Sequence, residues 1–451
     1  MAPITITFPK RTQEKETSLL MHYLDVVFPL QFPLHERSYE GRREWLLAVL
    51  TSSRSVYYAT LSLSLLHKES RLDDFESIWQ SERTRYYILA LQESQQLLDQ
   101  LDTAAGIAKL KGNIHALAST VQLISIEVNS LQIPAPPLAG HSDVLYTNRG
   151  TFYILQSSSL SLGDWQVHLL AGKALIPELV HCWALVPKSG RFASSVWSML
   201  DASQFSAAHD EDSLSFEYVG ALQFLTNILA MFGIFSCISI GPASSSFAEY
   251  RYLMEQDGMI QMDQIIGCKN WVLLAILEVG ELDKWKREEQ ENHRLSLKDL
   301  GTRAMAIEGM IETGLRELSG SAMVDLVTSI YATSTLTYMH TVVSGLNPNL
   351  REVQDSVSAT IVLLKQLPDV RIAKNLVWSL VVTGCMASRS QEDYFRGLIA
   401  VAGTSVRGLR NCWGLSTIWD RAWKMRDIMT TTSHTVWEDL INGQGPSTLL
   451  V

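Results

Sequence analysis

Along most of this chain, apolar residues recur three and four positions apart, which is the spacing of one face of an α-helix. We predict helices over residues 19–27, 44–67, 84–101, 104–128, 164–185, 191–200, 216–238, 267–286, 297–318, 324–343, 353–367, 373–387, 393–409 and 415–429. No alternating run is bounded by hairpin turns, so no strands are predicted. The pattern indicates an all-α fold: a single large multi-helix domain of packed antiparallel helices around a central apolar helix.

Proline-rich and polar stretches indicate how this domain is divided. Residues 1–17 are expected to form a flexible N-terminal arm, and residues 18–451 the helical domain. The stretch IPAPPLAGHSDVLYTNRG at 133–150 contains three prolines and two glycines. Because proline and glycine oppose helix formation, this stretch is expected to be an internal loop.

One segment has nearly the length of a membrane span. The residues from Tyr218 to Ala248 include no charged side chain, and LQFLTNILAMFGIFSCISI covers 222–240. It contains Gln223 and Asn227, however, and no basic residues flank it to set an orientation. We therefore expect the buried central helix of a large helical domain, with no membrane span.

Composition and charge exclude several classes of function. The 451 residues carry a net charge of −10 and no long run of Lys or Arg, whereas phosphate binding needs a concentrated basic face, so direct nucleic-acid binding is not expected. The five cysteines, at positions 182, 237, 268, 385 and 412, form no Cys-x-x-Cys pair. An odd number of cysteines and no signal peptide indicate reduced thiols in the cytosol or nucleus, and we expect a cytoplasmic protein.

The segment GCKNWVLLAILEVGELDKWK at 267–286 is the candidate functional helix. At about 100° per residue, one face collects Trp271, Ala275, Glu278, Leu282, Trp285 and Lys286. A buried charge needs a partner or a ligand, so a carboxylate and an ammonium in line with two indoles indicate the lining of a small-molecule pocket.

Several segments resemble the fungal-specific transcription factor domain, the regulatory region that follows a binuclear zinc cluster in many fungal regulators. They are VFPLQFPL (27–34), REWLLAVL (43–50), YYATLSLSLLH (57–67), IIGCKNWVLLAILEVGELDKWK (265–286), YMHTVVSG (338–345), VWSLVVTGCMA (377–387) and LSTIWDRAWKMRD (415–427). Two positions depart from the family pattern: Met231-Phe232-Gly233 replaces Trp-Phe-Asp, and Trp378-Ser379 replaces Trp-Pro. No six-cysteine cluster precedes these segments, so the resemblance implies a regulator's ligand-binding body without its DNA reader.

Among such proteins the chain is similar to the humulene synthases of fungal tropolone sesquiterpenoid pathways. The resemblance implies a Mg²⁺-dependent sesquiterpene cyclase that converts farnesyl diphosphate to a humulene-type hydrocarbon and diphosphate. In that group a lysine on this helix binds the diphosphate, and a residue one turn earlier shapes the product. Lys286 and Leu282 have that spacing.

Asn270, Leu274 and Glu278 occupy the i, i+4 and i+8 spacing of a terpene cyclase metal motif, with Leu in place of a hydroxyl residue. Such an enzyme needs Mg²⁺ and cations for the leaving diphosphate and a dry aromatic cavity for the carbocation. The expected site consists of Glu278, Asn270 and Asp263 as metal ligands, Lys286, Asn227 and Arg316 as diphosphate-binding groups, and Leu282, Trp271 and Trp285 as the cavity wall.

Each of these residues also has a structural interpretation. Glu278 would pair with a buried base, and Lys286 would extend along a helix end. Asn227 would make a helix–helix hydrogen bond, and Arg316 would join an intrahelical ion-pair row with Glu308 and Glu312. The alternative function is accordingly a non-catalytic transcriptional regulator or effector-binding protein without a zinc cluster. A homodimer is compatible with either function.

Overall fold

The computed structural model describes residues 10–34, 44–69, 77–101, 103–130, 143–146, 152–155, 165–184, 216–241, 247–256, 258–320, 322–404, 413–428, 437–442 and 449–450. In chain order its elements are α1 (Lys10–His22), η1 (Tyr23–Val27), α2 (Phe28–Gln31), α4 (Glu44–Ser52), α5 (Arg54–Glu69), α6 (Ser77–Leu101), α7 (Gly106–Ser130), β1 (Asp143–Tyr146), β2 (Phe152–Leu155), α8 (Trp165–Ala174), α9 (Ile176–Ala184), α11 (Phe216–Phe235), α12 (Cys237–Ile240), α13 (Phe247–Glu255), η3 (Met262–Gln264), α14 (Asn270–Glu291), α15 (Leu297–Arg316), α16 (Ala322–Ser344), α17 (Arg351–Leu364), η4 (Val370–Leu376), α18 (Val377–Cys385), α19 (Glu392–Thr404), α20 (Trp413–Ile428) and α21 (Trp437–Asn442).

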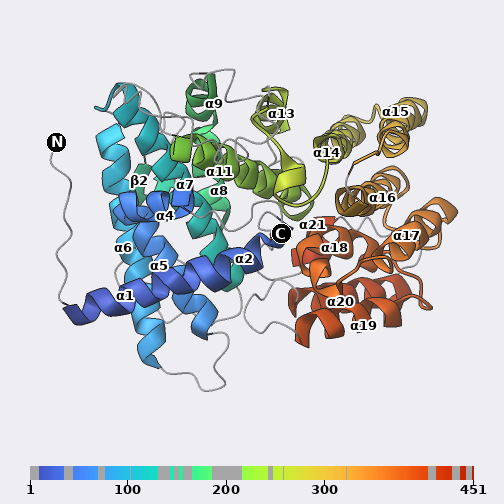
Figure 1. Ribbon diagram of the computed structural model, residues 1–451. Helices are drawn as coiled ribbons and strands as arrows, with labels where there is room; N and C mark the ends of the chain where they lie inside the picture. The colour runs from blue at the N-terminus through green and yellow to red at the C-terminus, as the bar shows by residue number, and fades with distance from the viewer. Residues whose placement is uncertain are drawn as a thin grey trace.

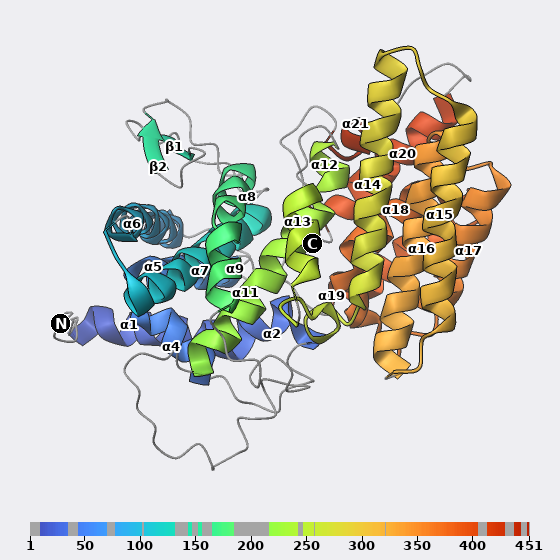
Figure 2. The same cartoon turned by 90° about the horizontal axis from the view of Figure 1, so that it is seen from above.

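The helices form two packed groups with α11 to α13 between them (Figure 1). Helices α1 to α9 make up the N-terminal group, in which α5 lies against α6 and α7. Helices α14 to α21 make up the C-terminal group, in which α16 contacts α14, α15, α17 and α18. Seen from above, α14, α15 and α16 run side by side (Figure 2). The all-α prediction is confirmed.

Helix α11 is the expected central apolar helix. It contacts α4, α7, α8 and α9 of the N-terminal group and α13 and α14 on its other side. Tyr218–Ile240 is long and apolar enough to cross a membrane by length and composition alone, but its most apolar window is wholly buried inside the fold. A side chain at Gly233 would overlap the Tyr250 ring, so glycine lets α13 pack closely on α11. This environment supports the core-helix interpretation of the segment.

Local sequence signals explain several helix ends. Ser296 caps α15 by accepting a hydrogen bond from the Asp299 amide at 3.2 Å. Gly345 follows α16 with φ +86°, a conformation that favours glycine, and its amide bonds Thr341 O at 2.9 Å. Pro177 lies in the first turn of α9, where its missing N–H costs no helical hydrogen bond. It therefore divides the predicted 164–185 helix into α8 and α9.

The N-terminal boundary differs from the expected one. The arm expected over residues 1–17 is helical from Lys10 onward, and residues 1–9 lie outside the described part. Glu16 is only 3% exposed. It accepts hydrogen bonds from Tyr86 Oη at 3.0 Å and Tyr57 Oη at 3.3 Å. These two phenols anchor α1 to α6 and α5.

Other differences concern the predicted loop and helix boundaries. Asp143–Tyr146 and Phe152–Leu155 pair as an antiparallel hairpin, so part of the loop expected at 133–150 is a strand. Residues 133–142 and 147–150 of that region, and the helix predicted at 191–200, lie outside the described residues. The helix predicted at 44–67 is interrupted at Ser53 between α4 and α5.

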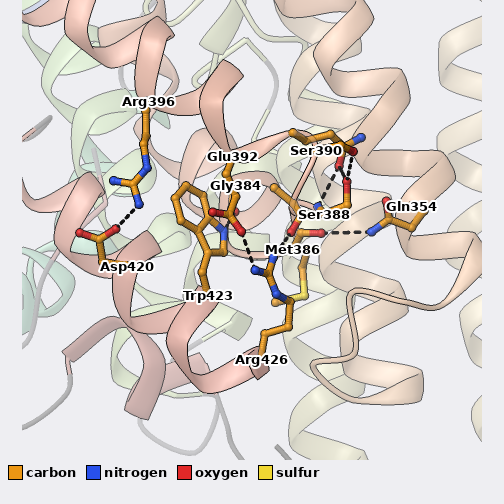
Figure 3. Close-up of polar contacts among 12 residues, drawn as sticks. Gln354, Gly384, Met386, Ser388, Ser390, Glu392, Arg396, Asp420, Trp423 and Arg426 are labelled. Carbon is orange, nitrogen blue, oxygen red and sulfur yellow. Dashed lines mark hydrogen bonds and ion pairs between the residues drawn. The ribbon is translucent and has the colours of Figure 1, made fainter. Parts of the chain in front are cut away.

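Two of the segments that carry the family resemblance interlock in the C-terminal group. A side chain at Gly384 in α18 would overlap the Trp419 indole of α20. Trp423 Nε1 donates to Gly384 O at 2.9 Å, and Arg426 Nη1 donates to Ala387 O at 2.8 Å (Figure 3). Arg426 also pairs with Glu392 at the start of α19. The Gly-Cys-Met-Ala segment and the Trp-rich helix are therefore matched parts of one packing arrangement.

Candidate functional site

The candidate site is a groove lined by residues of α13, α14 and α15. Helix α14 lies between α13 and α15 in both views (Figures 1 and 2). The groove has a volume of about 770 Å³ and is partly open to solvent. Its lining consists of Phe247, Ala248, Glu249, Glu278, Glu281, Leu282, Lys284, Trp285, Glu288, Arg303, Ala306, Ile307 and Met310. Part of the face of the candidate functional helix therefore lies in a hollow, and the hollow is not an enclosed chamber.

The floor of the groove is apolar. Phe247, Leu282 and Ile307 are 5%, 3% and 7% exposed, so they belong to the main core. Trp285 and Met310 are partly exposed and pack against the same core. At the rims, α13 and α15 present the exposed small residues Ala248 and Ala306.

An arginine from α13 determines the environment of Glu278. Arg251 Nη1 donates to Glu278 Oε1 at 2.6 Å, and its Nη2 lies 3.0 Å from Glu281 Oε1. The hydrogen bond that Arg251 donates to Glu278 raises the pKa of Arg251 above its ordinary value. Glu278 thus has a fixed cationic partner, which is the structural interpretation offered by the sequence, although that partner is only half-buried.

The two indoles of the predicted cavity face different partners. Trp285 lines the groove, and the Arg303 guanidinium lies 4.3 Å from the centroid of its ring, in cation–π contact. Trp271 packs against α15 instead, where a side chain at Gly314 would overlap its ring. Trp271 is not part of the groove lining.

Lys286 faces away from the groove toward α16. Its Nζ donates to Val342 O at 2.6 Å and to Val343 O at 3.4 Å, at the C-terminal end of that helix. A lysine there satisfies carbonyl groups that have no partner within the helix and complements the negative end of the helix dipole. Burial lowers the pKa of Lys286, while the nearby Asp283 opposes that shift. The expected contact with a diphosphate is therefore replaced by a helix cap.

The side chains of Asn227 in α11 and Asn270 in α14 both bind the backbone of residues 259–262, which follow α13. Asn227 Nδ2 donates to Met259 O at 3.1 Å, and its Oδ1 accepts from the Gln261 amide at 2.8 Å. Asn270 Nδ2 donates to Ile260 O at 2.7 Å, and its Oδ1 accepts from the Met262 amide at 3.0 Å. The sequence suggested a helix–helix hydrogen bond as the structural role of Asn227. Its partners instead lie in the segment that connects α13 to α14.

The remaining predicted residues lie apart from the groove. Asp263 Oδ2 pairs with Lys269 Nζ at 3.0 Å. Arg316 is exposed and donates to Glu312 O and Thr313 Oγ1 within its own helix, both at 3.2 Å. Its partner on Glu312 is thus the backbone carbonyl and not the carboxylate of the expected ion-pair row.

The structure thus brings only Glu278, Leu282 and Trp285 of the predicted site together. One oxygen on each residue expected to bind Mg²⁺ already has a partner: Glu278 contacts an arginine, Asn270 a backbone amide and Asp263 a lysine. Among the described residues, no group of three or more His, Cys, Asp and Glu side chains is placed to hold a metal ion. The Mg²⁺ site stays a prediction without support from this arrangement.

Sequence reasoning missed Arg251, Phe247, Arg303 and Ala306. Arg251 is 27 positions from Glu278 along the chain, so no local spacing connects the pair. Helical periodicity did predict α15 and could have placed Arg303 and Ile307 four positions apart on one face. Nothing in the sequence showed that this face turns toward α14.

Comparison with known proteins gives a consistent result. The fungal specific transcription factor domain matches residues 18–451. The chain is 67% identical over 449 residues to the trichothecene biosynthesis transcription regulator TRI10 of Trichoderma arundinaceum, covering 98% of this chain and 99% of the relative. It is 50% identical over 448 residues to the protein of the same name in Fusarium sporotrichioides, with the same coverage. The ustiloxin B cluster transcription factor ustR of Aspergillus flavus is 25% identical over 94% of this chain and 71% of its own length. No solved structure matches the chain.

These relatives contradict the enzymatic prediction. They are named as transcription regulators and factors, so the expected sesquiterpene cyclase, its humulene-type product and its substrate farnesyl diphosphate are wrong. The cause of the error is visible in the structure: Lys286 and Glu278, interpreted as ligand-binding charges, have partners within the protein. The regulator interpretation agrees with both observations. With its match over residues 18–451, the chain belongs to the fungal specific transcription factor domain family.

Proposed function

We propose that this protein is a transcription regulator of a fungal secondary-metabolite pathway, with trichothecene biosynthesis as the pathway it controls. One observation carries the proposal: the chain is 67% identical to a trichothecene regulator along 98% of its own length and 99% of the relative's. The match extends over 98% of this chain, so the segments that form the groove, the core and the interlocked C-terminal helices lie within the region of similarity. Shared regulation is therefore better supported than a shared fold alone.

The geometry favours regulation through binding. The groove has an apolar floor and charged rims, but it is open and its carboxylates Glu278 and Glu281 are engaged by Arg251. An open apolar groove fits a partner that supplies its own covering surface better than it fits a reaction that must exclude water. A regulator of this kind is a nuclear or soluble protein. A cytoplasmic location, the absence of direct nucleic-acid contact and a homodimer stay predictions.

Complementation tests the proposal directly. The gene for this chain is introduced into Trichoderma arundinaceum from which the 67% identical relative has been deleted. We expect transcripts of the trichothecene biosynthetic genes to return, because the two proteins share the whole domain. Reintroduction of the deleted relative is the positive control, and the empty vector is the negative control.

The level of the protein has to be measured beside the transcripts. If the chain accumulates as well as the reintroduced relative while the biosynthetic transcripts stay at the level of the deletion strain, the proposed function is wrong. If the chain does not accumulate, the same coding sequence is expressed from the relative's own promoter, and the same criterion is applied.

A further inference from the structure

We propose that helix α21 (Trp437–Asn442) is a conformational clasp. When docked it holds α12, α14, α16 and α20 together, and it opens as a unit while the rest of the fold stays intact. The inference goes beyond the proposed function, because it concerns the conformations of the chain and not the genes that the chain controls. Helix α21 contacts α20 of the C-terminal group and α12, which continues the central helix α11 (Figure 2).

Glu438 joins α21 to α14 and to the end of α12. Arg287 Nη1 lies 2.9 Å from Glu438 Oε1, and Arg287 Nη2 donates to Glu438 Oε2 at 3.3 Å. Asp283 orients the same guanidinium, because it accepts from Arg287 Nε at 3.1 Å and from Nη2 at 2.7 Å. A side chain at Gly241, which directly follows α12, would overlap the Glu438 carboxylate. Glycine at this position therefore lets Glu438 cross the end of α12 and reach Arg287.

Hydrogen bonds also hold α21 at both of its ends. At the start of the helix, Trp437 Nε1 donates to Thr341 Oγ1 of α16 at 3.0 Å. At its end, Arg421 Nη1 of α20 donates to Leu440 O at 2.8 Å and to Ile441 O at 2.9 Å. The last carbonyl groups of a helix have no partner within the helix, so Arg421 serves as the C-terminal cap of α21.

The length of α21 explains why it opens separately. A helix of six residues is not stable alone in water, so α21 is helical only while it is docked, and its contacts are lost together when it leaves. The central helix keeps other contacts with the C-terminal group. Phe235 of α11 stacks on Tyr331 of α16 and Trp378 of α18, with ring centroids 5.6 and 5.8 Å apart. These rings hold the two helix groups together in the open state.

Opening of the clasp exposes side chains that are otherwise covered. Trp437, Leu440 and Ile441 are 4%, 3% and 2% exposed when α21 is docked. The Trp437 indole lies edge-on to the ring of Tyr338, with centroids 6.3 Å apart, and Tyr338 is itself only 1% exposed. The open state therefore presents an apolar surface around Tyr338, with the Arg287 guanidinium at its edge.

Hydrogen exchange of the full chain, followed by mass spectrometry, tests whether α21 opens locally. Glu438→Gln removes the charge that pairs with Arg287, whereas Asp439→Asn removes a charge from the exposed side of the same helix. We expect the amides of α21 to exchange about fivefold faster in Glu438→Gln, with the rates in α5 and α16 unchanged. Asp439→Asn is expected to match the wild-type chain in all three helices.

Two results of the exchange measurement overturn the proposal. If α21 exchanges at the wild-type rate in Glu438→Gln, the ion pair with Arg287 does not hold the clasp closed. If exchange becomes faster in α5 and α16 by the same factor as in α21, the short helix unfolds only with the whole domain and is not a separate opening unit.

A second pair of variants tests whether α21 opens as a unit. Arg421→Met removes the cap at the end of α21, whereas Lys424→Met changes an exposed lysine of the same helix α20. If the whole helix opens together, loss of the cap also frees Trp437 at the other end. We expect chymotrypsin to cleave folded Arg421→Met after Trp437 about tenfold faster than the wild-type chain, and Lys424→Met to be cleaved at the wild-type rate.

The fragment that begins at Glu438 is quantified by mass spectrometry, and thermal unfolding shows that both variants are folded. A wild-type rate of cleavage after Trp437 in folded Arg421→Met overturns the proposal, because the two ends of α21 would then open independently.

Discussion

Lys286 and the amides of Asn227 and Asn270 bind the protein's own backbone. Lys286 caps the end of α16, and the two asparagines satisfy the amides and carbonyls of a loop between Met259 and Met262. A buried backbone group without a partner costs as much as a lost hydrogen bond, so these side chains contribute to stability. A polar side chain in an apolar segment does indicate that the side chain has a partner. For these three residues the partner is the protein's own backbone and not a ligand.

Replacement of Lys286 tests its role as a cap. Lys286→Met keeps much of the aliphatic stem but removes the bonds to Val342 O and Val343 O. We expect the free energy of unfolding to fall by about 1.5–3 kcal/mol, the usual range for a hydrogen bond to a charged group. Urea unfolding followed by circular dichroism measures the change.

The neighbouring lysine provides the control. Lys284 lines the open groove, and Lys284→Met is expected to change the free energy of unfolding by no more than about 0.5 kcal/mol. Equal losses in the two variants would show that the bonds to α16 contribute nothing specific.

At the scale of elements, glycine positions decide how closely helices pack. Gly384 in α18 faces the Trp419 indole, and its carbonyl accepts a bond from Trp423 Nε1. Gly397 in α19 is exposed, and a side chain there would meet nothing within 4 Å. The same residue type is thus required by close packing in one helix and only reduces helix stability in the other.

Alanine substitutions at these two glycines are expected to have opposite effects. Gly384→Ala forces α18 and α20 apart, with a cost of about 1–3 kcal/mol for overpacking. Gly397→Ala removes backbone freedom from the unfolded chain and is expected to stabilise the protein by roughly 0.5–1 kcal/mol. Thermal unfolding of both variants provides the comparison, and a loss of stability in Gly397→Ala or a gain in Gly384→Ala would contradict the packing described here.

Helical periodicity predicted most of the helices but not all of the positions where they begin and end. The α16 boundary followed from Ser344-Gly345, where glycine adopts a positive φ after the last turn. The break at Ser53 and the start of α1 at Lys10 had no comparable signal, because each depends on contacts with distant helices. Glu16, for example, is buried only because Tyr57 and Tyr86 surround it.

At the scale of the whole molecule, buried histidines couple stability to pH. His168 is 6% exposed in the N-terminal group, and its Nε2 lies 3.4 Å from Tyr87 Oη, which donates to Glu127. Burial lowers the pKa of His168 to about 4. In the unfolded chain a histidine titrates near ~6.5. Between these values the unfolded state binds more protons than the folded state, so stability is lost as the pH falls from about 6.5 to 4.

This coupling can be measured. As the pH falls through that interval, we expect His168 alone to lower the free energy of unfolding by roughly 1.4 kcal/mol for each pH unit. His168→Gln should reduce the slope of stability against pH by about that amount, whatever its effect on stability at neutral pH. Urea unfolding at several pH values gives the two slopes, and identical slopes would show that His168 does not stay neutral in the fold.

The spacing of apolar residues determined the all-α class, the central helix α11 and most of the later helices, because helical periodicity is a local property of the chain. The ordered family segments likewise indicated the transcription factor domain. Tertiary structure alone decided the partners of the charged and amide side chains. Glu278 and Arg251 are 27 positions apart, and Lys286 and Val342 are 56 apart. A charge paired within the protein and a charge paired with a ligand give the same pattern in sequence, so only the packing of α13 and α16 against α14 distinguishes them.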